Sequence, residues 1–155
     1  MSELLLLSCV GEPLKRNVRR LNLNMKKHLQ FYVTVILAIA LFDLIASLAS
    51  RMFVFDYTKL FWASWCIYFI AGFVGCKRLG FIGGIISGLV AGFGDATLGW
   101  FLSMAVGPYL PNRPQQQYGI VIVGITIVIV SLLGVFFGLL GASLSKLLNR
   151  GLASR

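Results

Sequence analysis

Four long apolar runs constrain this chain more than any other feature of its sequence. They cover residues 29–50, 60–75, 79–106 and 118–148. A helix needs roughly 20 apolar residues to cross the hydrocarbon core of a bilayer, and these runs are of that order. None of them alternates polar and apolar residues, as the strands of a membrane barrel do. The runs therefore predict an all-α, polytopic integral membrane protein built as a four-transmembrane-helix bundle.

The runs also define the expected domain organisation. Residues 29–148 are expected to form one transmembrane domain, preceded by a basic cytoplasmic segment at 1–28 and followed by a cytoplasmic tail at 149–155. The expected spans are about 29–50, 58–76, 79–106 and 118–147. The second run is short for a span, so we extend it to residue 58, and the third and fourth are long enough to tilt or bend.

Composition supports lipid as the solvent of this chain. Hydrophobic residues make up 58% of the sequence and charged residues 12%, whereas soluble domains average about 45–50% and 25%. The lipid bilayer is therefore the first expected partner. The net charge of +9 does not predict nucleic-acid binding, because no basic stripe interleaved with aromatic residues is present.

The distribution of basic residues predicts the orientation of the spans. Eleven Lys and Arg residues lie before the first run, between the second and third, or at the C-terminal end of the fourth run and beyond, and three lie on the opposite side. Basic residues collect on the cytoplasmic side, so both termini are expected in the cytoplasm. The three tryptophans would then lie near the outer ends of their spans, where indole rings prefer the interface. Short loops and this charge bias suggest a bacterial inner membrane.

The N-terminal segment has an amphipathic pattern. Between residues 14 and 29, five apolar residues recur at helical spacing with Lys and Arg between them: Leu14, Val18, Leu21, Met25 and Leu29. Such a helix would lie on the anionic inner leaflet. Met25 followed by Lys26 and Lys27 also resembles a translation start just before the first span, which leaves open whether residues 1–24 belong to the native protein.

Glycines at a four-residue spacing predict a helix-packing face in the third span. The series comprises Gly80, Gly84, Gly88 and Gly92. The fourth span has a second series, Gly134, Gly138 and Gly141. Small residues let helix backbones approach closely in lipid, where no hydrophobic effect presses helices together. The two faces could pack against each other within one chain, which we favour, or join two copies into a homo-oligomer or a larger membrane complex.

Two acids inside the apolar runs form a candidate proton or ion site. At 1.5 Å per residue, Asp43 lies about 21 Å and Asp95 about 24 Å from the cytoplasmic ends of their spans. An ionisable group at such depth is expensive and is a functional candidate by default. Thr97 lies close to Asp95 in sequence and joins the candidate site. The alternative is that each acid only forms structural hydrogen bonds to Thr97, Ser47, Ser64 or Ser103, or an ion pair with Arg51.

The remaining motifs do not predict an enzyme. His28 is the single histidine, and no nucleophile elbow, zinc-protease motif or phosphate-binding loop is present. The three cysteines include no C-x-x-C pair, so neither a zinc site nor a disulfide framework is predicted. No cofactor and no metal are expected.

Two functions are compatible with these features. The first, which we favour on sequence alone, is a structural or accessory membrane subunit that associates through its glycine faces. The second is a small proton- or cation-coupled transporter or channel component that uses Asp43 and Asp95.

Overall fold

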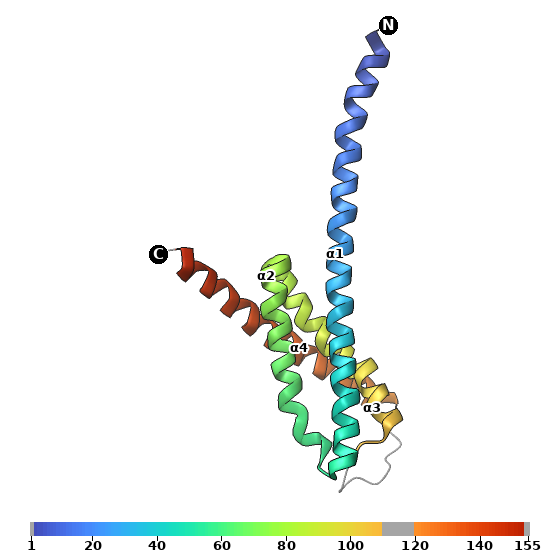
Figure 1. Cartoon of the computed structure of the whole chain (residues 1–155), viewed down its shortest axis with the longest axis vertical. Helices are drawn as coiled ribbons and strands as arrows, with labels where there is room; N and C mark the ends of the chain where they lie inside the picture. The colour runs from blue at the N-terminus through green and yellow to red at the C-terminus, as the bar shows by residue number, and fades with distance from the viewer. Residues whose placement is uncertain (1, 110–119, 154–155) are drawn as a thin grey trace. The chain divides into compact units, whose positions relative to one another are not determined.

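The computed structural model describes residues 2–109 and 120–153, and within them the side chains of residues 25–109 and 120–151. The expected all-helical fold is confirmed, since no strand occurs in these ranges. The elements are α1 (Ser2–Phe53), the 3-10 helix η1 (Tyr57–Leu60), α2 (Phe61–Gly94), the π-helix η2 (Asp95–Gly99), α3 (Trp100–Val106) and α4 (Ile120–Ala153), as drawn in Figure 1.

The chain divides into two compact units, Met1–Val33 and Thr34–Arg155. The second unit contains everything discussed below. The amphipathic face expected within residues 14–29 lies mostly outside the described side chains, and the expected start of the fourth span at residue 118 lies outside the described residues.

Three helical stretches are long and apolar enough to cross a membrane. They are Met25–Phe53, Tyr57–Val106 and Ile120–Gly151. The expected count of four separate spans is not matched. The reason is local: the helix continues through residues 76–79, where we expected a loop, so the second and third expected spans belong to one helical stretch.

This stretch reverses direction at Gly80. Gly80 has φ 84° and ψ 177°, a backbone conformation that only glycine adopts without strain. In a straight helix residues 72 and 84 would lie about 18 Å apart. Instead, a Cβ built on Gly84 would lie 2.6 Å from the Gly72 carbonyl oxygen. The two arms of α2 therefore lie side by side and meet at a turn, as the two green arms in Figure 1 show.

Gly80 forms this turn and has no packing role. A Cβ built on it would meet nothing within 4 Å among the described atoms. Its assignment to the packing face was wrong, because the four-residue series predicts a continuous helix and the backbone leaves the helical region at this residue. The next three glycines of the series do lie in an interface.

The second arm of α2 packs against α4 through glycines of both helices. A Cβ built on Gly88 would lie 2.6 Å from the Gly138 Cα, and one built on Gly92 would lie 3.0 Å from the Gly134 Cα. Gly84 faces Ala142 in the same way, at 2.8 Å from its Cβ. Residue numbers rise along α2 while they fall along α4, so the helices are antiparallel. The two glycine faces thus pack within one chain.

Helix α4 also contacts the first arm of α2. Gly141 lies against the backbone of Phe69 and Phe73, and Gly72 lies against the backbone of Gly138. Gly72 was not among the expected packing residues, since it stands outside the four-residue series. Contact with both arms lets α4 hold the α2 hairpin closed.

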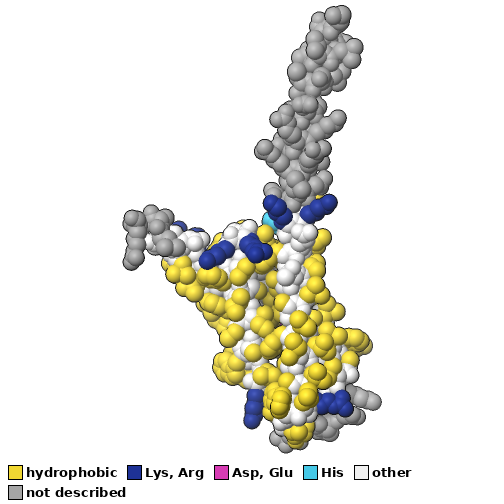
Figure 2. Space-filling view, viewed as in Figure 1, with side chains coloured by type: hydrophobic (Ala, Val, Ile, Leu, Met, Phe, Trp, Pro, Cys, Tyr) yellow, Lys and Arg dark blue, Asp and Glu magenta, His cyan; other side chains and the backbone are white. Residues whose placement is uncertain are grey.

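The surface of the second unit is largely apolar. Isoleucine, leucine and valine side chains along α4 are exposed, among them Ile125 at 55% and Leu132 at 63%. Exposed basic residues lie at the turn of the α2 hairpin (Lys77 and Arg78). Two more lie near the other end of the hairpin, in the last turn of α1 (Arg51) and in η1 (Lys59). Figure 2 shows the apolar surface lying between basic side chains. Large continuous apolar surfaces of this kind mark contact with lipid or with another protein.

Candidate functional site

The two acids of the apolar runs meet in the structure. Asp43 of α1 is only 2% exposed, and its carboxyl group lies close to that of Asp95. Both groups face Gly99: a Cβ built on this glycine would overlap a carboxyl oxygen of Asp43 and lie 3.2 Å from Asp95 Oδ1. Asp43 and Asp95, which the sequence places at similar depth along their spans, therefore lie close together in the structure.

Two tyrosines extend this acid pair on either side. The Tyr57 hydroxyl donates to Asp43 Oδ1 at 3.1 Å, and the Tyr68 hydroxyl donates to Asp95 Oδ2. The order of the connected groups is Tyr57, Asp43, Asp95, Tyr68. Tyr68 is 1% exposed, and a hydroxyl so deeply buried needs a hydrogen-bond partner.

Sequence reasoning missed both tyrosines. Tyr68 stands in the middle of the second apolar run, where its hydroxyl is one of few polar groups. Buried tyrosine hydroxyls usually find an acceptor, and Asp43 and Asp95 were the two unpaired acceptors at hand. A hydrogen bond from the Tyr68 hydroxyl to one of these two acids could therefore have been predicted from the sequence.

The local backbone explains how Asp95 is aimed at Asp43. Residues Asp95–Gly99 form a π-helix between α2 and α3, and such single-turn π segments occur often at functional sites. Gly99 is buried, and the absence of a side chain there leaves the space that the Asp43 carboxyl group occupies.

The charges and hydrogen bonds of the two acids limit the protonation states that the pair can adopt. Asp43 Oδ2 is buried and has no hydrogen-bond donor among the described residues. Ionised carboxylates only accept hydrogen bonds, so two carboxyl groups this close can bond to each other only when one of them holds a proton. Two negative charges at such close range repel each other strongly where water is scarce. Charge balance therefore favours one proton, or one bound cation, at the pair.

Three of the five other partners expected for the acids are engaged elsewhere, whereas Ser64 lines a pocket together with Asp95 and Ser47 Oγ is buried without a hydrogen-bond partner among the described residues. Thr97 donates to the Phe93 carbonyl of its own helix at 2.6 Å, and Ser103 donates to the Trp100 carbonyl at 3.0 Å. The Arg51 guanidinium donates to the Val106 carbonyl at 3.0 Å, so it ties α1 to the end of α3. These bonds satisfy backbone carbonyl groups. The hydrogen bonds described for the two acids come from the tyrosines.

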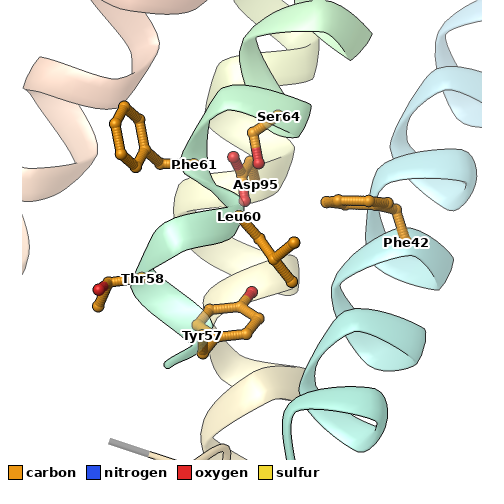
Figure 3. A pocket seen from close by; sticks show the side chains of 7 residues that line it. All are labelled: Phe42, Tyr57, Thr58, Leu60, Phe61, Ser64 and Asp95. Atoms are coloured by element: carbon orange, nitrogen blue, oxygen red, sulfur yellow. The ribbon is translucent and has the colours of Figure 1, made fainter. Parts of the chain in front are cut away.

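A pocket of about 260 Å³ opens beside the acid pair. It is lined by Phe42, Tyr57, Thr58, Leu60, Phe61, Ser64 and Asp95. In Figure 3, the Phe42 ring points from α1 toward the other lining side chains, and Ser64 and Asp95 come from different helical segments of the pocket wall. Thr58 is exposed, so the pocket connects the acid pair with the surface near η1.

Residues around this pocket fix its mouth. Asp56 accepts hydrogen bonds from the Thr58 backbone N–H at 2.9 Å and from its hydroxyl at 2.7 Å, which caps η1. The Tyr57 N–H donates to the Tyr109 carbonyl at 3.3 Å. The end of α3 therefore lies beside η1, and both are held at the mouth of the pocket.

Comparison of the chain with protein-family models, curated proteins and solved structures finds no match. Its function is therefore inferred from the residues of the site.

Proposed function

We propose that this protein is a small proton- or cation-coupled transporter or channel component, and that the Asp43–Asp95 pair is its coupling site. The observation that carries the proposal is that buried Asp43 and half-buried Asp95 lie close together among helices that are apolar enough to span a membrane. Acids inside spans mark proton relays and ion pathways when they are paired and wetted. Here the pair has its own tyrosine donors and an adjoining pocket.

Reversible binding follows from the chemistry of this arrangement. The pair holds one shared proton, and a cation entering from the pocket would balance the same charge in its place. Tyr57 and Tyr68 donate to the outer oxygens of the pair, which keeps both carboxyl groups oriented during the exchange. Coupling the movement of protons to that of another cation requires at least one site that can bind either of them in turn.

We further propose that the chain crosses the membrane four times, with both termini in the cytoplasm. The reversal at Gly80 supports this count, because each arm of α2 together with its neighbouring short helix can cross separately. The basic-residue bias supports the orientation. A Lys77→Cys variant without the native cysteines should react with a membrane-impermeant maleimide only from the cytoplasmic side; labelling from outside would contradict this topology.

The proposal predicts proton-linked flux that depends on Asp95. Wild-type protein in liposomes should move protons or monovalent cations under an imposed gradient, measured with an internal pH dye. Asp95→Asn should lower the flux to the leak of protein-free liposomes, because the amide cannot release a proton. Thr97→Val is the matched control, since Thr97 bonds only its own helix among the contacts described, and it should keep wild-type flux. No flux from wild-type protein would refute the proposal.

The structural or accessory role has less support. It was expected from the glycine faces, and these faces are already covered within the chain by α2 and α4. Association through them is therefore not needed to bury them.

A further inference from the structure

We propose that the pocket binds a small organic ammonium ion, which displaces the proton of the acid pair. This inference rests on the proposed function and names the class of its substrate. Its basis is the combination of aromatic rings, hydroxyl groups and the Asp95 carboxyl group around a single pocket. Asp95 in turn lies close to Asp43, whose Oδ2 is buried without a donor among the described residues.

The lining favours an organic cation over a metal ion. Phe42, Phe61 and Tyr57 contribute three aromatic rings, and the faces of such rings attract ammonium groups. A divalent metal would need several carboxylate or imidazole ligands, and no group of three or more such residues occurs in the part of the chain described. Asp95 supplies the single negative charge that a monovalent cation needs.

The size of the pocket limits the ligand. At about 260 Å³ it lies just below the range of roughly 300–1,000 Å³ that holds drug-sized molecules. The Ser64 and Tyr57 hydroxyl groups lie at its wall and can bond one polar substituent of the ligand. A quaternary ammonium ion with a short hydroxyalkyl arm has this size and this chemistry.

The charge balance links binding to proton release. The empty pair carries one proton and one negative charge. When the ammonium ion binds beside Asp95, the shared proton leaves to solvent through the pocket, and the cation neutralises one of the two carboxylates. One cation enters and one proton leaves, so the net charge of the site is unchanged.

Choline and its uncharged isostere 3,3-dimethylbutan-1-ol test this inference. With purified full-length protein in detergent micelles, calorimetry should show saturable binding of choline and none of the isostere. In weak buffer, an indicator dye should report proton release on choline binding. Sodium ions at the same concentration should not reproduce the binding isotherm.

Variants separate pocket binding from adsorption to micelles. Asp95→Asn should abolish choline binding and proton release. Phe42→Leu should weaken binding by about threefold or more through the loss of a cation–π contact, whereas Phe93→Leu, on an exposed side chain outside the pocket, should leave it unchanged. Should Asp95→Asn fail to elute as a folded species, the Phe42 and Phe93 pair still decides the matter.

Three outcomes would overturn the inference: no choline binding, equal binding of the isostere, or equal weakening by Phe42→Leu and Phe93→Leu. If wild-type protein carries Asp95-dependent proton flux but fails this test, only the substrate class is refuted. If it binds choline but shows no proton flux in liposomes, the proposed transport function is refuted and the proposed binding site is supported.

Discussion

Gly88→Leu is expected to separate α2 from α4 and so to destabilise the protein. A Cβ at this position would overlap the backbone oxygen of Gly134 and approach the Gly138 Cα to 2.6 Å. Backbone atoms cannot rotate away as a side chain can, so the helices must separate. Forced overpacking costs about 3 kcal/mol at the upper end of the usual range, and the separation also removes the close contacts that hold helices together in lipid. Thermal unfolding in detergent, followed by helical circular dichroism, measures the loss.

Gly124→Leu is the matched control for this experiment. Gly124 lies in the same α4 helix that receives Gly88, and a Cβ there would meet nothing within 4 Å among the described atoms. Its replacement should leave unfolding unchanged or raise stability slightly, because glycine weakens a helix interior by up to about 1 kcal/mol. Equal behaviour of the two variants would mean that the glycine faces do not pack as described. A stable Gly88→Leu monomer derived from a wild-type oligomer would instead support association between copies.

Gly99→Ala is expected to abolish proton-linked flux without changing either acid. The added Cβ would overlap the Asp43 carboxyl group and crowd Asp95 Oδ1 at 3.2 Å. Because Asp43 is 2% exposed, its carboxyl group has little room to move aside without leaving its partner. The pair should therefore separate, and flux in liposomes should fall to the level of Asp95→Asn.

Gly94→Ala provides the comparison for Gly99→Ala. Gly94 directly precedes the π-helical segment that Gly99 ends, and the three atoms nearest to a Cβ on Gly94 would all belong to Ile36, the nearest at 3.5 Å. That is an ordinary van der Waals distance, so Gly94→Ala should retain flux. Loss of flux in both variants would point to a general effect on this helix, and retention in both would show that Gly99 does not hold the acids together.

The helical class and the glycine interface could be predicted because each depends on patterns within a run. Long apolar runs decide between helix and strand, and the four-residue spacing puts Gly84, Gly88 and Gly92 on one face. The role of Gly80 could not be read in this way. Its positive φ breaks the helix that the four-residue spacing implies. The expected break between the second and third spans lay just before it, at the basic pair 77–78.

The site was predicted only in part. Asp43 and Asp95 are conspicuous because ionisable groups are rare within apolar runs, and counting residues along each span gives their similar depth. The partners Tyr57 and Tyr68 depend on how separate helices rotate toward each other, which no single run encodes. The space left by Gly99 depends in the same way on the position of Asp43 across the interface.

The most direct test of the central claim is an infrared titration of the carboxyl groups in wild-type protein, Asp43→Asn and Asp95→Asn. Two acids that share a proton titrate as a coupled pair. Asp43→Asn identifies the carboxyl band of Asp43 by its loss, and we predict that this band shifts its midpoint when Asp95 is replaced. A midpoint that stays at its wild-type value in Asp95→Asn would show that the acids do not meet, and would contradict the account.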